Sequence, residues 1–229
     1  MSFLIIKLMN IVKKKKNYTL VFDSSGSIFI PKFSILVISD LHIGKSYSFA
    51  KHGNFLPPYD IDDTIERIKF NINLYNPKKI ISLGDSFHEN STLKVINNSH
   101  IKKINKIFKN IEVYLIDGNH DAELKFKEKI NAFFKESLKL GNFNFKHIKD
   151  TQNVNNLFEF SGHFHPKVTI RFNKVRYSFK CFVLGENFCI LPSFGTFTGG
   201  LNINSNVLKK ILPKKKTIIA LGKSKLIEI

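Results

Sequence analysis

The 229-residue chain has no tryptophan, two cysteines and, among 36 basic residues, only three arginines. Cys181 and Cys189 cannot cross-link a chain of this size into a disulfide scaffold, and their scarcity favours a reducing compartment, so we expect a cytoplasmic protein. No apolar run approaches the ~20 residues of a membrane-spanning helix, so no membrane partner is expected. Without tryptophan, the sequence offers no obvious base-stacking platform of the single-strand-binding kind.

Acidic residues are also scarce, because 18 aspartates and glutamates face 36 lysines and arginines, for a net charge of +18. Such an excess is typical of a partner for a polyanion such as nucleic acid. Lysine, isoleucine, asparagine and phenylalanine are enriched together, however, which is the bias of an AT-rich genome. Two interpretations of the charge stay open, a DNA-binding surface and codon-driven surface lysines.

The N-terminus begins with an apolar segment, Phe3 to Val12, that is interrupted by Lys7 and followed by Lys13–Lys16. Basic residues after the apolar run, rather than before it, are wrong for a secretory signal peptide. We expect residues 1–17 to be an N-terminal extension. The remainder, residues 18–229, has the length of one domain.

The first half of the chain alternates short apolar runs with helical patterns. Isoleucines at helical spacing predict a helix that begins at Asp60, as N-cap, and ends at Asn76 before Pro77; a weaker helix spans Ile101–Phe108. A hairpin over Leu20–Phe22 and Ser27–Ile30 precedes them. Continuous apolar runs predict three buried strands, Ser34–Ser39, Lys79–Leu83 and Ile111–Ile116. Strands that alternate with helices indicate a largely parallel sheet, whose ligands bind at the carboxyl ends of the strands.

The second half has a different pattern. A lysine-rich segment, Glu128–Leu140 within Leu124–Leu140, is expected to be helical. Short β-prone runs then predict a second sheet, from Phe143–His147, Leu157–Ser161, Val168–Phe172, Arg176–Leu184 and Phe188–Leu191 to a last hairpin, Thr217–Leu221 with Lys225–Glu228.

Four polar clusters stand at the ends of predicted strands. They are Asp40-Leu-His42, Gly84-Asp85, Gly118-Asn119-His120-Asp121 and Gly162-His163-Phe-His165. Each is weak alone, but charged groups at the ends of buried strands need partners, and a metal accounts for all of them together. Imidazole, carboxylate and amide ligands suit Mn, Fe, Zn or Co, and there are enough of them for two cations ~3.5–4 Å apart, with hydroxide between them as nucleophile toward a phosphate ester.

Read in order, these clusters resemble the signature of the calcineurin-like metallophosphoesterases. The resemblance implies an α/β fold, a four-layer α/β/β/α sandwich of two mixed sheets flanked by helices. It implies two divalent cations, of which manganese is the expected metal. The first cation would be held by Asp40, His42, Asp85 and His165, and the second by Asp85, Asn119, His147 and His163. It further implies that His120 faces the phosphate as acid or hydrogen-bond donor and that Asp121 orients its ring.

A narrower resemblance covers roughly residues 20–200. Segments such as Asp40-Leu-His-Ile-Gly-Lys45, Leu83-Gly-Asp-Ser-Phe-His88 and Leu191-Pro-Ser-Phe-Gly195 are similar to ligase-associated DNA damage response endonucleases of the PdeM type. This implies DNA as substrate, with an ATP-dependent DNA ligase and a DEXH-box helicase as partners in repair.

Two further residues are candidates for substrate contact. Lys45 could reach a phosphate, and His88 could line or support the site, although either could equally be an ordinary loop residue. Two alternatives to a DNA endonuclease also stay open. One is a nucleotide or dinucleotide phosphohydrolase on the same scaffold, and the other is a non-catalytic binding module.

Overall fold

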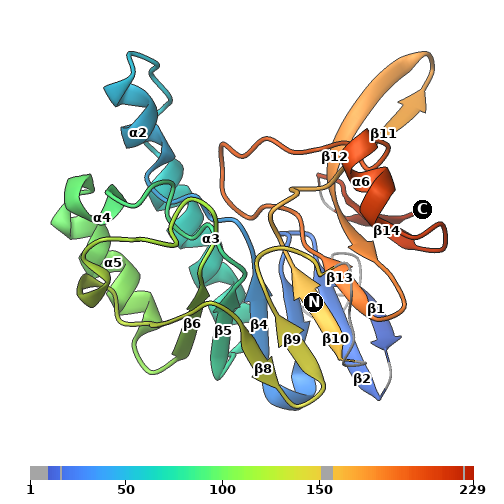
Figure 1. The fold of residues 1–229 in the computed structure, drawn as a ribbon, viewed down its shortest axis with the longest axis horizontal. Coiled ribbons are helices and arrows are strands. Elements are labelled where there is room, and N and C mark those ends of the chain that lie inside the picture. The colour runs from blue at the N-terminus through green and yellow to red at the C-terminus, as the bar shows by residue number, and fades with distance from the viewer. Residues whose placement is uncertain (1–9, 16, 151–156, 224) are drawn as a thin grey trace, which may run out of the picture.

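The computed structural model describes residues 10–15, 17–150, 157–223 and 225–229, in which two β-sheets pack face to face (Figure 1). The first sheet has the order β1-β2-β3-β4-β5-β6-β7. It is antiparallel from β1 to β4 and parallel from β4 to β7. Its strands are β1 Asn10–Lys15, β2 Tyr18–Asp23, β3 Ile28–Ile30, β4 Ile35–Ile38, β5 Lys79–Ser82, β6 Glu112–Ile116 and β7 Phe133–Lys135.

The second sheet has the order β15-β14-β12-β13-β10-β9-β8, and β11 pairs with β12 outside that path. Strand β10 is parallel to both β9 and β13, whereas the other pairs are antiparallel, so this sheet is mixed as well. Its strands are β8 Leu138–Leu140, β9 Phe143–Phe145, β10 Phe158–Ser161, β11 Lys167–Phe172, β12 Val175–Leu184, β13 Phe188–Ile190, β14 Thr217–Leu221 and β15 Leu226–Glu228.

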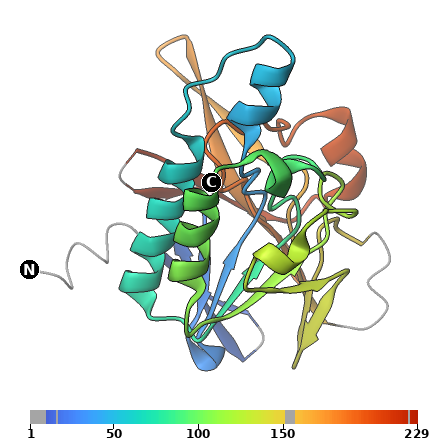
Figure 2. The ribbon, with the colours of Figure 1, turned by 90° about the vertical axis from the view of Figure 1, so that its left-hand side faces the viewer.

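Helices cover the outer faces of the two sheets (Figures 1 and 2). The helices are α2 Lys45–Lys51, α3 Asp60–Tyr75, α4 Thr92–Val95, α5 Asn98–Phe108 and α6 Asn206–Ile211. Helices α3 and α5 pack on the first sheet through one apolar cluster, and α6 packs on the second through another. A third cluster, rich in phenylalanine, fills the space between the sheets. The predicted four-layer α/β/β/α arrangement is therefore confirmed.

Strand β4 shows why continuous apolar runs occur in the first sheet. All four of its residues are buried. Val37 packs between the two sheets, whereas Leu36 and Ile38 pack against the helices. Both faces of the strand are covered, so polar residues can appear only where the strand ends.

Helix α3 follows its isoleucine pattern and ends at Asn76, which adopts a left-handed φ of 44° just before Pro77. The prediction of Asp60 as its N-cap was wrong. Tyr59 occupies the cap position, and Asp60 is the first helical residue. Its carboxylate instead accepts hydrogen bonds from the backbone amide of Ser46, at 3.2 Å, and from its hydroxyl, at 2.5 Å. Asp60 thereby holds the start of α2 against the start of α3.

The helix predicted over residues 128–140 was also wrong. After a single 3-10 turn at Lys127–Lys129, the chain forms β7 and then β8, which pairs with β9. Apolar side chains in β8 alternate with an exposed lysine, because Leu138 and Leu140 are half-buried and Lys139 is exposed. This period of two is the strand pattern, and the abundance of lysine conceals it.

The predicted N-terminal extension lies partly outside the described residues. Within it, residues 10–15 form β1, which pairs with β2 in register from Asn10↔Asp23 to Lys15↔Tyr18. Among the described residues, no helix is both long enough and apolar enough to cross a membrane.

Candidate metal centre

The four polar clusters meet where strands of the two sheets end. Asp40 follows β4, Asp85 follows β5, and the cluster that contains His120 follows β6, all at the carboxyl edge of the parallel part of the first sheet. His147 and His163 follow β9 and β10 of the second sheet, which are also parallel to each other. The face-to-face packing of the sheets brings these ends together.

The first group of candidate ligands consists of Asp40, His42 and His165. The Nε2 atoms of His42 and His165 are 3.3 Å apart, and Nε2 of His165 lies 3.2 Å from Oδ1 of Asp40. Asp40 is fully buried, and its carboxylate accepts hydrogen bonds from the Ser39 hydroxyl, at 2.5 Å, and from the His163 backbone amide, at 3.1 Å. These donors fix the carboxylate in place.

The second group consists of Asp85, His147 and His163. Nε2 of His147 lies 3.4 Å from Oδ2 of Asp85 and 3.1 Å from Nδ1 of His163. The same oxygen of Asp85 lies 3.8 Å from Nε2 of His42, in the first group. One carboxylate oxygen therefore stands between the two sets of histidines.

The donor atoms fit a pair of divalent cations. Two nitrogens bound about 2.1 Å from one cation lie about 3 Å apart, which is close to the spacing within each histidine pair. Nδ1 of His147 lies 2.8 Å from the carbonyl oxygen of Leu83. A carbonyl can only accept a hydrogen bond, so Nδ1 carries the proton and Nε2 is directed to the centre as a metal ligand requires.

Protonation states are shaped by burial and by the carboxylates. Burial lowers the pKa of His42 to about 3, so its ring is neutral at pH 7. Burial alone would lower the pKa of His147, but contact with Asp85 and the charge of Asp40 raise it to about 9. Burial acts to raise the pKa of Asp85, but His147 and the His120 amide hold it well below its usual range. A cation must therefore displace a proton from His147.

The backbone is strained at five of the candidate ligands. Asp40, His42, Asp85, His163 and His165 all have left-handed φ values, between 43° and 68°. A residue with a side chain seldom adopts this region, and such strain gathers where function requires it. Left-handed turns at Asp40 and His42 lie where these residues, two apart in the sequence, direct both side chains to the same group.

Two glycines of the clusters allow the loops to approach the carboxylates. A Cβ on Gly118 would lie 2.2 Å from Oδ1 of Asp85, and a Cβ on Gly162 would lie 2.4 Å from Oδ2 of Asp40. Both distances are far below a van der Waals contact. The glycines in these two clusters are therefore required by the close packing of the loops on the buried acids.

The cluster after β6 lies at the edge of the centre. Asn119 and His120 are exposed, and the backbone amide of His120 donates to Oδ1 of Asp85 at 2.9 Å. The ring of His120 is close enough to His42 and Asp85 to form a third potential ligand group with them. No hydrogen bond of Asn119 to the other ligands occurs among the described residues, so its place in the second group stays a prediction.

Asp121 connects two loops beside the centre. Its two oxygens accept hydrogen bonds from the backbone amides of Gly118, at 2.8 Å, and Phe87, at 3.1 Å. In the described part of the chain no hydrogen bond joins Asp121 to the ring of His120, so its role in orienting that ring stays a prediction. Asp121 ties the loop after β6 to the loop after β5.

The two predicted substrate-contact residues lie beside the first group. Nδ1 of His88 is 3.3 Å from Nδ1 of His42, and its ring stacks on His120 with centroids 5.3 Å apart. Burial and the nearby ammonium of Lys45 lower the pKa of His88 to about 4. His88 therefore contacts His42 at Nδ1, whereas Nε2 of His42 faces the other candidate ligands. Lys45 adds positive charge near His88. His52 and His100, outside the clusters, contact Ser48 and Asp62 instead.

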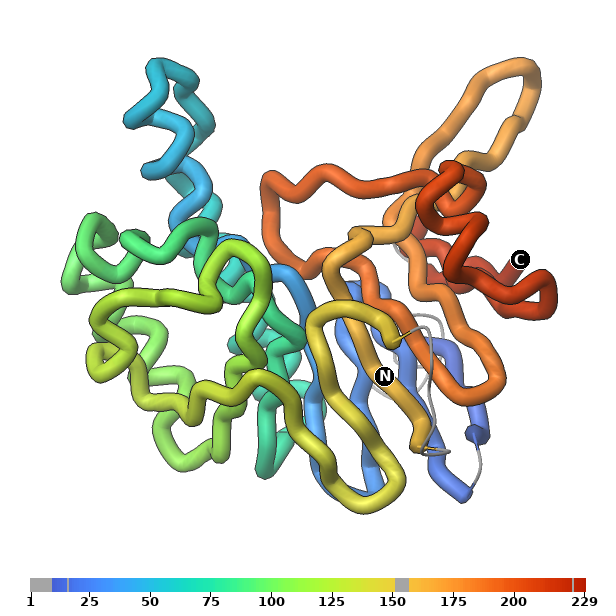
Figure 3. Tube along the Cα trace, viewed as in Figure 1, coloured from blue at the N-terminus to red at the C-terminus, as the bar shows by residue number. Residues whose placement is uncertain are grey.

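Two basic side chains, Lys180 and Arg67, hold the loop after β13, and no sequence pattern singles them out. The Nζ atom of Lys180 donates to the carbonyl oxygens of Ser193, at 2.8 Å, and Gly195, at 3.0 Å, and to the hydroxyl of Thr198. From the opposite side, Arg67 donates to the carbonyl of Phe194 at 2.6 Å. The amide of Gly195 in turn donates to the carbonyl oxygen of Asp40 at 3.1 Å. This loop, seen between α3 and the second sheet in Figure 3, therefore braces the backbone of Asp40, a candidate ligand.

Lys180→Met is expected to destabilise the fold by about 2 kcal/mol at pH 7, because three oxygens lose their donor. Burial lowers the pKa of Lys180 to about 7, below the ~10.4 of an unfolded lysine. Between these values the unfolded state holds more protons, so the free energy of unfolding should rise with pH in the wild type and lack this rise in the variant. Urea denaturation at pH 7 and 9.5 measures both effects.

The exposed Lys209 on α6 supplies the matched control, since Lys209→Met removes the same charge without a buried contact. We expect that substitution to change stability by less than ~0.5 kcal/mol. Equal unfolding curves for Lys180→Met and the wild type would contradict the bracing role.

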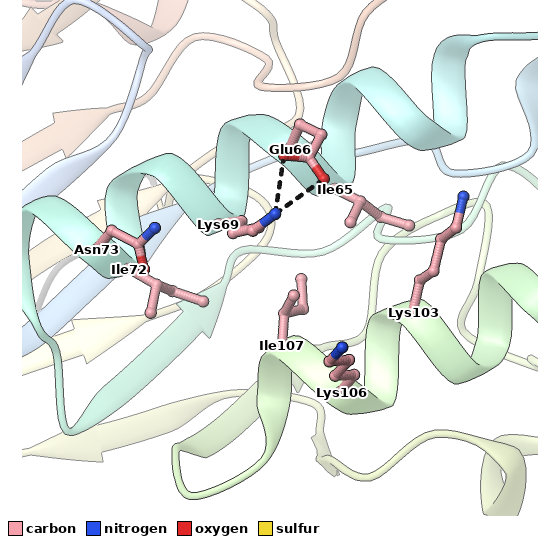
Figure 4. Close-up of a pocket in the computed structure, with 8 residues that line it drawn as sticks. All are labelled: Ile65, Glu66, Lys69, Ile72, Asn73, Lys103, Lys106 and Ile107. Carbon is pink, nitrogen blue, oxygen red and sulfur yellow. Dashed lines mark hydrogen bonds and ion pairs between the residues drawn. The ribbon is translucent and has the colours of Figure 1, made fainter.

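A separate groove of about 430 Å³ lies between α3 and α5 (Figure 4). Its wall combines the apolar side chains of Ile65, Ile72 and Ile107 with Lys69 and Lys106. None of its lining residues belongs to the ligand groups, so the groove is distinct from the metal centre.

Comparison with known proteins agrees with this geometry. No curated protein matches this chain. Among solved structures, nuclease MPE of Pseudomonas putida shares the fold, with a TM-score of 0.76 and 24% identity over 95% of this chain and 100% of the other. The phosphoesterase Yfce of E. coli matches more loosely, with a TM-score of 0.44 and 13% identity over 85% of this chain and 97% of the other. The family model of the calcineurin-like phosphoesterases matches residues 33–220, and the chain belongs to that family.

Proposed function

We propose that this protein is a dinuclear metal-dependent phosphodiesterase that acts on DNA as an endonuclease. The observation that carries the proposal is the position of Asp85, whose Oδ2 atom lies 3.8 Å from His42 and 3.4 Å from His147. A carboxylate shared by two groups of histidines is the arrangement of a two-metal site for phosphate-ester hydrolysis.

In this proposal the chain holds the two cations as the family resemblance implies. Asp40, His42, Asp85 and His165 hold one, and Asp85, Asn119, His147 and His163 hold the other. Manganese is the proposed metal, with Fe, Zn and Co as alternatives. The cations, when bound, supply positive charge that polarises a phosphate ester and lowers the pKa of water.

The residues around the ligands complete the site. His120 is exposed beside Asp85, where its imidazole can donate a proton to the oxygen of the leaving group. Two divalent cations bring a charge of +4 against −2 from Asp40 and Asp85, so the site attracts a phosphodiester anion. Lys45 adds to this field at the side of the first group.

DNA as the substrate rests on three observations. The chain shares its fold with a protein described as a nuclease, and its net charge is +18. The two residues at the outer edge of the centre, Asn119 and His120, are exposed, which suits a polymer that passes over the site. The repair setting, with a DNA ligase and a DEXH-box helicase in the cytoplasm, is proposed from the sequence resemblance.

The test is a panel of substrates for the purified, manganese-loaded protein. We expect nicking or cleavage of single-stranded or duplex DNA together with hydrolysis of bis(p-nitrophenyl) phosphate, and loss of both activities on chelation. Hydrolysis of dinucleotides without any action on DNA would replace the endonuclease by a small-molecule phosphohydrolase. Failure to hydrolyse any phosphate ester with any of the four metals would leave only the non-catalytic binding module.

A further inference from the structure

Strands β11 and β12 form a hairpin that extends beyond the second sheet (Figures 1 and 3). Their ladder runs without interruption from Lys167↔Lys180 to Phe172↔Val175. The second sheet pairs with β12 only over Cys181–Leu184, so the outer part of the hairpin is supported by its own ladder alone. Its turn is formed by Asn173 and Lys174, both with left-handed φ.

The two faces of this hairpin differ in chemistry. One face begins with Val168, which is buried against the core that contains Leu208 of α6, and continues with Ile170 and Phe179. Side chains alternate along a strand, so the residues between them point to the other face. That face, called the cationic face below, consists of Lys167, Thr169, Arg171, Arg176, Ser178 and Lys180.

Contacts at its base show that the cationic face adjoins the metal centre. Lys180 donates to the carbonyl of Gly195, whose amide donates to the carbonyl of Asp40. Thr169, opposite Ser178 in the ladder, accepts a hydrogen bond from Asn202 at 2.7 Å, at the far end of the same loop. The cationic face therefore lies on the side of the loop that braces the centre, whereas α6 covers the opposite face.

Arg171 and Arg176 are direct cross-strand partners near the tip of this face. Both are exposed, and neither forms an ion pair or a side-chain hydrogen bond within the described residues. Like charges directly opposite each other destabilise an antiparallel pair. An anion bound between the two guanidinium groups would remove that repulsion.

The chemistry of the pair selects the anion. Two of the three arginines in the chain are placed here, although lysine supplies nearly all its other positive charge. A planar guanidinium binds phosphate through two parallel hydrogen bonds, which a lysine cannot do. Arg176 lies four residues, or about 13 Å, along β12 from Lys180, so the pair is positioned for phosphates remote from the one at the metal centre.

We propose that the β11–β12 hairpin is a DNA-binding arm that contacts the phosphate backbone through Arg171 and Arg176 on one flank of the cleaved bond. This inference rests on the proposed function, since it takes DNA as the substrate. The arm supplies affinity and register for a polymer. It contributes nothing to the hydrolysis of a small diester, which does not extend beyond the metal centre.

The test compares Arg171→Gln/Arg176→Gln with the wild type by fluorescence anisotropy of a labelled 30-nucleotide DNA at 50 to 300 mM salt. We expect the Kd of the variant to rise about tenfold at 50 mM salt. The slope of log K against log salt should become shallower by about 1.4 for single-stranded DNA, because two phosphate contacts are lost. Hydrolysis of bis(p-nitrophenyl) phosphate by the manganese-loaded protein should stay within twofold.

Two further variants separate a specific arm from bulk charge. Lys102→Gln/Lys109→Gln removes the same charge from exposed residues in and just after α5, on the other sheet, and should leave the Kd within twofold. Arg171→Lys/Arg176→Lys keeps the charge and should retain the wild-type salt slope with a smaller loss of affinity. The proposed arm would be overturned if Lys102→Gln/Lys109→Gln weakened DNA binding as much as Arg171→Gln/Arg176→Gln does. It would also be overturned if the arginine-to-glutamine variant bound DNA with an unchanged Kd.

The outcomes also distinguish the arm from the enzymatic proposal. A wild type that binds DNA through the arginine pair but cleaves none would support the arm and contradict the endonuclease. If the wild type cleaves DNA and Arg171→Gln/Arg176→Gln does not change its affinity for DNA, the arm is contradicted and the endonuclease is not. If loss of the two arginines weakened binding to phosphatidylserine vesicles but not binding to DNA, the cationic face would be a membrane-binding surface and the proposal would be overturned.

Discussion

Asp85→Asn is expected to reduce the hydrolysis of both DNA and bis(p-nitrophenyl) phosphate by at least ~1,000-fold, since the several kcal/mol that a two-metal site contributes depend on the shared ligand. The amide keeps the shape of the side chain but removes its negative charge. In the wild type this charge lies 3.8 Å from His42 and 3.4 Å from His147. Without the charge of Asp85, only the carboxylate of Asp40 would offset the repulsion between two cations. The second cation should therefore be lost.

Metal content measured beside activity tests this explanation directly. We expect manganese to fall from two equivalents to one or fewer in Asp85→Asn. Asp62→Asn is the matched control, because Asp62 lies on α3 with Lys103 and His100 as partners and should leave both readouts unchanged. Wild-type activity in Asp85→Asn, or in a fully chelated sample of the wild type, would contradict a dinuclear mechanism.

The convergence of the ligands illustrates what can be predicted from sequence. Buried strands such as β4 are recognisable because both faces are covered, and a polar residue directly after such a strand must lie at the edge of the sheet. This physical rule places Asp40 and Asp85 together. It does not place His163, which comes from the other sheet and was grouped with them only because one metal centre would account for all four polar clusters. His147 was assigned only through the order of motifs in a known family.

Other features had no local signal. The left-handed turn at His42 depends on the backbone amide of this residue donating to the carbonyl of Asp85, a contact between loops. Asp121 satisfies backbone amides of two different loops, so its part depends on tertiary structure. Lys180 looks like any other lysine in a lysine-rich strand, and only the folded chain shows that three oxygens surround its ammonium. Hydrophobic periodicity carries no information about any of these contacts.

His120→Ala should lower the rate on DNA by at least ~100-fold while both cations stay bound, whereas the rate on bis(p-nitrophenyl) phosphate, whose p-nitrophenolate leaving group needs little protonation, should fall much less. The imidazole of His120 is exposed, whereas its backbone amide holds Asp85. Alanine preserves that amide and removes only the ring, so the substitution separates proton donation from support of the shared ligand. The exposed His52 provides the control, and His52→Ala should leave the rate within twofold.

The alternative for His120 comes from the geometry of the centre itself. Its ring lies with His42 and Asp85 in a group that could hold a cation, and its centroid is 5.1 Å from that of His42. If the ring were a ligand, His120→Ala would lose manganese in parallel with activity, and excess metal would restore part of the rate. If His120 is an acid catalyst, the variant should keep two equivalents of manganese, and excess metal should not restore its rate. Bis(p-nitrophenyl) phosphate, whose leaving group needs no proton, should keep most of its wild-type rate of hydrolysis in the variant only if His120 is a proton donor.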